Sequence, residues 1–233
     1  MQLTKHHGLG NDFLIALGEE VDAARARQLC DRHTGIGADG LIVATREPLT
    51  MVLYNADGSR AEMSGNGIRC LAQALVDAGW IGEGEVKIAT DAGVRVVHVG
   101  SEVEPGLRHV SVDMGPARHA GELVSMGNPH EVIVVEDVSA VTDPHKPDRN
   151  VEYIAPGPGP DAITMRVWER GVGETRACGT GACAAAWAAR QQGLVSEHVT
   201  VHQPGGDAVV DLKPDTIVLT GPAQLIATIQ VRA

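Results

Sequence analysis

Residues 178–189 read Cys-Gly-Thr-Gly-Ala-Cys-Ala-Ala-Ala-Trp-Ala-Ala, and this stretch decides the fold that we expect for the chain. Alanine is the strongest helix former, so a helix is expected from the end of Cys178-Gly179-Thr180-Gly181 to Gly193. The glycines at its start leave backbone amides accessible to a ligand. Because a helix N-terminus stabilises a negative charge, this start is a candidate anion site.

A second stretch opens in the same way. Ser64-Gly65-Asn66-Gly67 precedes apolar residues at 68, 71, 72 and 75, the spacing of an amphipathic helix, which is expected to end at Gly79. Cys178 follows Ser64 at an offset close to half the chain (178 − 64 = 114), and two glycines of each stretch coincide at that offset. Gly10-Asn11-Asp12 similarly has a counterpart in Gly127-Asn128-Pro129. The shared order of these features suggests two similar halves.

The remaining pattern predicts mostly strands. A further helix, capped by Asp22, is expected to run towards His33 and to stop at Gly35. The fold expected is α/β of the α+β kind, with two pseudo-symmetric domains, each a mostly antiparallel sheet around a central helix, and an active site in the interdomain cleft. Residues 114–122 are the expected boundary, and the proline-rich run 143–161 is expected to be a surface excursion. Apolar alternation predicts strands at residues 41–44, 50–54, 94–99, 109–113, 131–135, 163–168, 199–201, 208–212, 216–220 and 224–231.

Composition narrows the functional classes. The 19 Lys and Arg against 30 Asp and Glu give a net charge of −11, and six residues are aromatic, so no basic footprint for nucleic acid is present. No apolar run reaches the roughly 18 residues of a membrane span, and no signal peptide is visible, so a cytoplasmic protein is expected. The four cysteines are too sparse for a disulfide scaffold and lack zinc-site spacing, so no metal is expected.

The position of Cys178 gives it a chemical interpretation. A thiol at a helix N-terminus is expected to have its pKa lowered from about 8.5 towards neutrality, which makes it a reactive group. Cys30, Cys70 and Cys183 are interpreted as buried structural cysteines. Phosphate binding by the glycine loops is the alternative, but neither loop ends in the Gly-Lys-Ser or Gly-Lys-Thr of a nucleotide-binding loop.

Six motifs together resemble the diaminopimelate epimerase family. They occur in that family's order and span nearly the whole chain. They are His7-Gly8-Leu9-Gly10-Asn11-Asp12-Phe13, Gly35-Ile36-Gly37-Ala38-Asp39-Gly40, Asn55-Ala56-Asp57-Gly58-Ser59, Ser64-Gly65-Asn66-Gly67-Ile68-Arg69-Cys70, Gly127-Asn128-Pro129-His130 and Glu169-Arg170-Gly171-Val172-Gly173-Glu174-Thr175-Arg176-Ala177-Cys178-Gly179-Thr180-Gly181.

The resemblance implies a cofactor-independent isomerase that interconverts LL- and meso-diaminopimelate for lysine and peptidoglycan precursor synthesis, and a homodimer. It also implies that the final strand returns to the first domain, so the expected halves are residues 1–116 with 222–233, and residues 117–221. The implied substrate contacts are the side chains of Asn11, Asn55, Asn128, Asn150, Glu169 and Arg170 and backbone groups of Gly65, Asn66, Gly179 and Thr180, with His130 in support.

The family uses two cysteines, one from each half, to remove and return the α-proton, and here the pattern departs from it. Cys178 matches one of them, but the other position holds Ser64. A hydroxyl is a far weaker acid than a thiol. Three explanations remain open: an epimerase deliberately altered at position 64; a natural variant that relays protons through water or performs one-base chemistry such as elimination; and a non-catalytic amino-acid-binding protein.

Overall fold

A computed structural model describes residues 1–144, 146 and 148–232 of the chain. These residues form two compact units, Met1–Val112 with Pro222–Ala233, and Asp113–Gly221. Ala233, which ends the first half expected from the sequence, lies outside the described residues. The predicted placement of the active site relative to the two halves stays a prediction.

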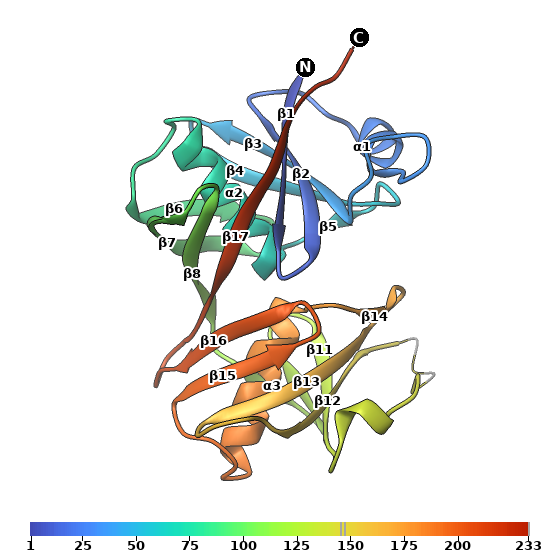
Figure 1. Cartoon of the computed structure of the whole chain (residues 1–233), viewed down its shortest axis with the longest axis vertical. Coiled ribbons are helices and arrows are strands. Elements are labelled where there is room, and N and C mark those ends of the chain that lie inside the picture. Colours follow the sequence, from blue (N-terminus) through green and yellow to red (C-terminus); the bar gives the residue numbers. More distant parts are fainter. Residues whose placement is uncertain (145, 147, 233) are drawn as a thin grey trace. The chain divides into compact units, whose positions relative to one another are not determined.

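In the first unit the strands surround one helix, α2 (Figure 1). The pairings run β1–β2–β3–β4–β6–β7–β8–β17 and return to β1, so the sheet closes on itself. The pairs β2–β3 and β4–β6 are parallel. The elements are β1 (Gln2–Gly8), β2 (Asn11–Leu17), α1 (Ala23–Cys30), β3 (Gly40–Arg46), β4 (Leu49–Asn55), β5 (Arg60–Ala61), α2 (Gly65–Asp77), β6 (Gly84–Thr90), β7 (Gly93–Glu104), β8 (Leu107–Gly115) and β17 (Ile217–Gln230).

The helix α2 is buried on every side along its first three turns. Ile68, Leu71 and Leu75 are fully inaccessible. The guanidinium of Arg69 is also buried, and it donates to the carbonyl of Gly65 at 3.1 Å and to Oδ1 of Asn66 at 2.8 Å. Since a buried charge is costly unless its donors are paired, these bonds allow an arginine inside the barrel.

The second unit repeats this plan around α3, which packs against six strands (Figure 1). Most of its buried residues are glycine or alanine, so small side chains form the contact between this helix and the strands. The sheet order is β9–β10–β11–β12–β13–β15–β16–β17, with β11–β12 and β13–β15 parallel and β14 beside β13. The elements are β9 (Arg118–Ala120), β10 (Leu123–Ser125), β11 (Pro129–Val134), η1 (Val138–Ala140), β12 (Asn150–Pro156), β13 (Ala162–Glu169), β14 (Gly173–Thr175), α3 (Gly179–Gln191), β15 (His198–Gln203) and β16 (Gly206–Leu212).

The structure confirms the α+β class and the three helices, and it corrects several details. The helix capped by Asp22 ends at Cys30, because the next residue, Asp31, turns to accept backbone N–H groups of His33 and Thr34. The strands expected at 216–220 and 224–231 are one continuous strand, β17. The surface excursion at 143–161 was wrong for its second part, since residues 150–156 form β12 between β11 and β13.

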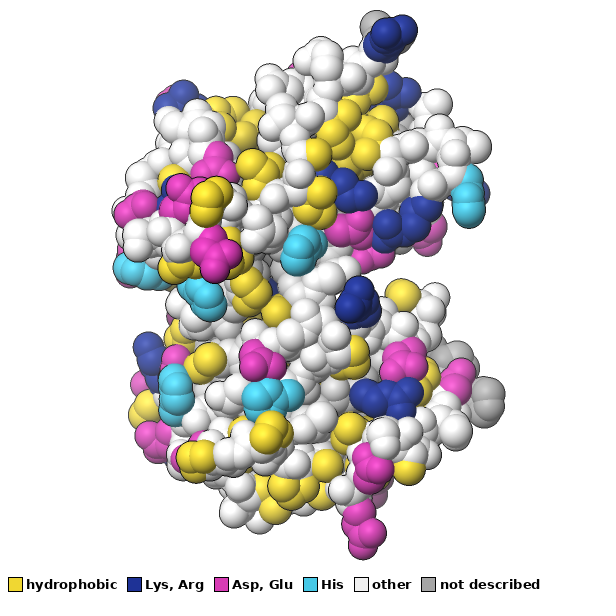
Figure 2. Space-filling view, in the orientation of Figure 1, with side chains coloured by type: hydrophobic (Ala, Val, Ile, Leu, Met, Phe, Trp, Pro, Cys, Tyr) yellow, Lys and Arg dark blue, Asp and Glu magenta, His cyan; other side chains and the backbone are white. Residues whose placement is uncertain are grey.

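Among the described residues, none of the helices has the length and apolar character needed to cross a membrane. On the face shown in Figure 2, acidic and basic side chains are interspersed over both units.

The central position of α2 leads to a stability prediction. Leu71→Ala deletes a fully buried side chain inside the barrel, so the free energy of unfolding should fall by about 2–5 kcal/mol. Val172→Ala, at a position that is 73% exposed, should change it by less than about 0.5 kcal/mol. Urea titration followed by circular dichroism measures both. Equal effects of the two substitutions would contradict a packed central helix.

Candidate active site

Cys178 is the N-cap residue of α3, and its thiol faces two other side chains of the predicted site. No side chain caps this helix, and the backbone N–H of Cys178 donates to Oε1 of Gln203 at 3.0 Å. The Sγ atom lies 3.3 Å from Oε2 of Glu169 and 3.5 Å from Oγ1 of Thr180. The thiol is therefore held beside a carboxylate at the start of the helix.

Burial sets the acidity of this thiol, and the sequence-based expectation of a lowered pKa is wrong. Cys178 is 5% exposed, and burial raises the pKa of its thiol well above the ordinary value. The carboxylates of Glu169 and Glu152 raise the pKa further, whereas the bonds to Thr180 and to the backbone of Gly181 lower it. These bonds at the helix start lower the pKa by less than burial and the two carboxylates raise it, so we expect a thiol and not a thiolate at neutral pH.

Glu169 is oriented by the hairpin that it begins. It ends β13, and the chain returns as β14 through a turn in which Gly171 has φ 76°. The hydroxyl of Thr175 on β14 donates to Oε1 of Glu169 at 2.6 Å. One carboxylate oxygen is thus fixed by Thr175, and the other accepts from the thiol of Cys178.

Two asparagines predicted to contact substrate lie in the same unit. Asn150, the first residue of β12, accepts from the backbone N–H of Arg170 at 2.9 Å and donates to the carbonyl of Pro129 at 3.2 Å. Asn128 directs its amide nitrogen at the hydroxyl of Thr180, 3.5 Å away. The side chain of Arg170 is exposed. These contacts bring the predicted residues of the second half together at the start of α3.

His130 completes this cluster from β11, and it leads to a residue that the sequence did not indicate. Its Nε2 lies 3.0 Å from Oδ1 of Asn128, and its Nδ1 lies 2.6 Å from Oε1 of Glu152. The same Glu152 oxygen would lie 2.6 Å from a Cβ atom at position 181. A Cβ at position 181 would therefore force the Glu152 carboxyl group to move, so the glycine, whose φ is not positive, leaves room for that group.

The first unit presents a similar helix start with different chemistry. Ser64 is the N-cap residue of α2, and its Oγ accepts from the backbone N–H of Gly67 at 3.0 Å. Asn66 is buried and donates to Oδ1 of Asn11 at 3.2 Å, and Asn11 donates to Asp39 at 2.8 Å. The hydroxyl of Ser64 thus caps its own helix, which Cys178 does not do in α3.

The structure brings some of the predicted site residues together and leaves others apart. Within the first unit the structure brings Asn11, Gly65 and Asn66 together with Ser64. Asn55, at the end of β4, donates to Oγ of Ser59 at 2.9 Å, so its amide stabilises its own turn. Three residues that contact the predicted site residues were not themselves predicted. They are Glu152, which contacts His130, Thr175, which contacts Glu169, and Gln203, which contacts Cys178. Glu152 was missed because its strand was taken for a loop, whereas Thr175 and Gln203 are ordinary strand residues whose role depends on pairing.

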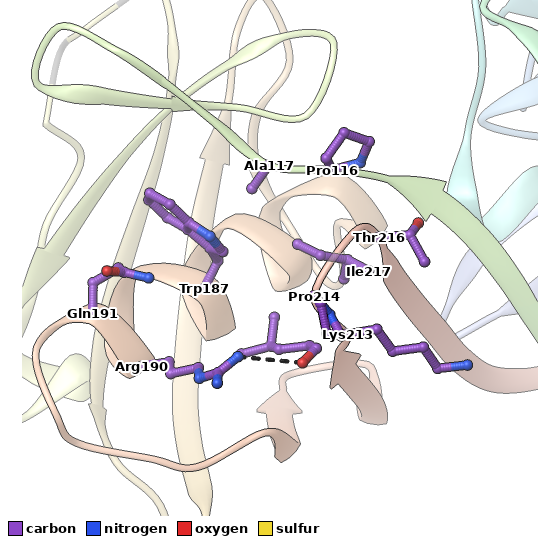
Figure 3. A pocket seen from close by; sticks show the side chains of 10 residues that line it. Pro116, Ala117, Trp187, Arg190, Gln191, Lys213, Pro214, Thr216 and Ile217 are labelled. Atoms are coloured by element: carbon purple, nitrogen blue, oxygen red, sulfur yellow. Dashed lines mark hydrogen bonds between the residues drawn. The ribbon is translucent and has the colours of Figure 1, made fainter.

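The second unit also has a hollow that lies away from these residues. This hollow of about 400 Å³ is lined by Trp187, Arg190 and Lys213 among others, and it contains none of the predicted site residues (Figure 3). Within residues 1–144, 146 and 148–232, no group of three or more His, Cys, Asp and Glu side chains is placed to hold a metal ion.

Comparison with solved structures identifies the class of fold. The chain is similar to a phenazine biosynthesis protein of the PhzF family from Bacillus anthracis, with a TM-score of 0.77, 13% identity, and coverage of 100% of this chain and 99% of that one. It is also similar to a hydroxyproline epimerase from Agrobacterium vitis, with a TM-score of 0.72, 15% identity, and coverage of 99% and 92%. At these identities the likeness establishes a fold that epimerases also use.

Sequence comparison identifies the family. The model of the family described as diaminopimelate epimerase matches residues 3–120 and 122–226. The chain is 40% identical to the diaminopimelate epimerase of Pelotomaculum thermopropionicum, over 96% of each chain. It is 38% identical to that of Streptomyces coelicolor, over 96% of this chain and 92% of the relative. The chain belongs to the diaminopimelate epimerase family and is an isomerase of the epimerase type.

The raised pKa of Cys178 makes its reactivity testable. At pH 7 iodoacetamide should alkylate Cys178 slowly, and the rate should rise only at a pH above the ordinary thiol pKa of about 8.5. Glu169→Gln removes a negative charge beside the sulfur, so the pKa should fall and alkylation at pH 7 should accelerate. Peptide mass spectrometry across a pH series measures both rates. Rapid alkylation of the unaltered chain at pH 7 would contradict this assignment.

Proposed function

We propose that the chain acts on diaminopimelate, interconverting its LL and meso forms by moving the proton of one α-carbon. The observation that carries this proposal is the buried thiol of Cys178, held between Glu169 and Thr180 at the start of α3. It is supported by membership of the diaminopimelate epimerase family.

The reacting carboxylate would be bound by backbone N–H groups. An α-proton becomes removable when the charge that it leaves is delocalised into the adjacent carboxylate, and amides at a helix N-terminus stabilise that charge. Gly179 and Thr180 are the first two residues of α3 and supply such groups. The family resemblance gives the same role to Gly65 and Asn66 at the start of α2.

Cys178 is suited to the acid half of the reaction. Its S–H bond breaks as a new C–H bond forms at the α-carbon, which leaves a thiolate beside Glu169. In the reverse direction that thiolate takes the proton from the α-carbon. Because the carboxylate of Glu169 destabilises a thiolate, it keeps Cys178 protonated at rest and makes the thiolate, once formed, a stronger base that readily takes a proton back.

The opposite half of the reaction needs a base, and Ser64 is poorly suited to it. A serine hydroxyl remains protonated at neutral pH, and here its oxygen already accepts the N–H of Gly67. In this proposal Ser64 therefore limits turnover, while binding of the substrate is retained.

The second head group of the substrate would be bound by polar side chains of the second unit. Arg170 is exposed and suits a carboxylate, and Asn150 fixes the backbone of Arg170 by accepting its N–H at 2.9 Å. A ligand that carries an amino-acid group at both ends could bind the start of α3 with one end and the region of Arg170 and Asn150 with the other.

The reaction would use no cofactor, since two side chains supply the acid and the base. The protein would act as a homodimer in the cytoplasm, in lysine and peptidoglycan precursor synthesis. The four cysteines, all buried free thiols in the structure, support a reducing compartment.

A second candidate function follows from Ser64. With Cys178 and Glu169 in place and no thiol at position 64, the site could exchange an α-proton from one face without inverting it. The natural chain would then catalyse proton exchange or elimination on a related amino acid, or it would bind an amino acid without catalysing a reaction.

Deuterium incorporation tests the proposal. In D2O, NMR should show slow epimerisation of LL-diaminopimelate by the unaltered chain, and Ser64→Cys should accelerate it by about 10²–10⁴-fold, the usual contribution of one acid–base group. Cys178→Ala in the Ser64→Cys background should abolish the gain. Ordinary enzyme turnover by the unaltered chain would contradict the limiting role of Ser64. Exchange without inversion would support the second candidate.

A further inference from the structure

Glu152 is a buried carboxylate that the proposed reaction leaves without a role. It lies on β12, and its side chain is fully inaccessible. One oxygen, Oε1, lies 2.6 Å from Nδ1 of His130. Among the described residues the other oxygen, Oε2, has no hydrogen-bond partner. Since a buried carboxylate is costly, its presence on a central strand calls for a specific use.

The contacts of His130 with Glu152 and Asn128 indicate which of its ring nitrogens carry a proton. The Nε2 atom of His130 lies 3.0 Å from Oδ1 of Asn128. An amide oxygen only accepts, so Nε2 carries a hydrogen and donates it. The other ring nitrogen, Nδ1, shares one further proton with Oε1 of Glu152, either as N–H to carboxylate or as O–H to neutral imidazole. In both forms His130 presents Nε2–H to Asn128.

This chain of bonds sets the direction of the Asn128 amide. Because its oxygen accepts from His130, its nitrogen is turned to the other side, where Oγ1 of Thr180 lies 3.5 Å away at the start of α3. The NH2 group is a donor, so Asn128 presents a hydrogen to that region and not an acceptor. A ligand carboxylate fits this arrangement, whereas an ammonium group would require the opposite orientation.

The surroundings of Glu152 are fitted to a fixed carboxyl group. A Cβ at position 181 would lie 2.6 Å from Oε1, so the glycine there provides room for it. Burial raises the pKa of Glu152, and the bond to His130 lowers it. The first effect is the larger one, which favours a proton shared within the pair over a bare buried carboxylate.

We propose that Glu152 is a positioning residue which, through His130, fixes the amide of Asn128 as a donor to a carboxylate of the substrate. This inference rests on the proposed function, since it assigns a specificity within the same site. Glu152 contacts neither the substrate nor the reacting atoms and acts only through the intervening ring.

The first experiment needs no ligand. Long-range ¹H–¹⁵N correlation spectra report which nitrogens of a histidine ring are protonated, and the His130 signals are identified by their loss in His130→Gln. Nε2 should be protonated in the unaltered chain and in Glu152→Gln, whose amide can donate to Nδ1 in place of the shared proton. An unprotonated Nε2 in the unaltered chain would overturn the proposal.

The second experiment measures affinity for diaminopimelate by calorimetry, using the chain with Ser64 because slow turnover permits binding to be observed. Glu152→Leu should weaken binding by about tenfold, whereas Glu152→Gln should stay within about threefold of the unaltered chain. Glu174→Gln changes a partly exposed carboxylate of the same unit, paired with Arg166, and is the matched control that should not alter affinity.

A double substitution separates positioning from general loss of structure. If Glu152 acts through Asn128, then Asn128→Ala together with Glu152→Leu should weaken binding no more than Asn128→Ala alone. Additive losses, or unchanged affinity in Glu152→Leu, would overturn the proposal. Absence of binding by the unaltered chain, with Nε2 protonated as expected, would contradict the proposed substrate and still support the positioning of Asn128 by Glu152.

Discussion

The contact between Sγ of Cys178 and Oε2 of Glu169, at 3.3 Å, is the interaction on which the rest of the site depends. It requires a helix that begins at Cys178, a strand that ends at Glu169, and a hairpin that brings Thr175 back to hold the second oxygen. Small side chains form the buried surface of α3, and Gln203 fixes the backbone at the cap by accepting the N–H of Cys178. The fold of the second unit is thus the means of placing a thiol beside a carboxylate.

The acidity of Cys178 shows which physical effect is the largest at this helix start. An exposed helix N-terminus would lower the pKa of a thiol, but here water is excluded and two carboxylates lie near the sulfur. Burial and the two carboxylates together raise the pKa of the thiol by more than the helix start lowers it, so we expect the thiol to be protonated. The corresponding position in the first unit holds a hydroxyl that caps its own helix. The two halves therefore share a backbone plan and differ in chemistry.

Much of the fold could be predicted because its signals are local. The glycine openings and apolar spacing of 64–79 and 178–193 identify both central helices, and alternation identifies nine of the 17 strands that the described residues form. It did not predict β1, β2 or β6. The Asn150–Pro156 strand was missed because the prolines near it are typical of loops. Its pairing with β11 and β13 also cannot be seen in the local sequence pattern. For the same reason Glu152 was not predicted. The direction of the Cys178 pKa shift was also wrong, since burial and neighbouring carboxylates are properties of the folded chain.

The site depends on Cys178 being a thiol whose S–H group donates a hydrogen bond to Glu169. Infrared spectroscopy observes this directly, because an S–H bond has a stretching band and a thiolate has none. In a difference spectrum between the unaltered chain and Cys178→Ala at neutral pH, we expect one S–H band to be lost, and we expect that band to shift in Glu169→Gln. A difference spectrum without an S–H band would mean that Cys178 is a thiolate and would contradict the account.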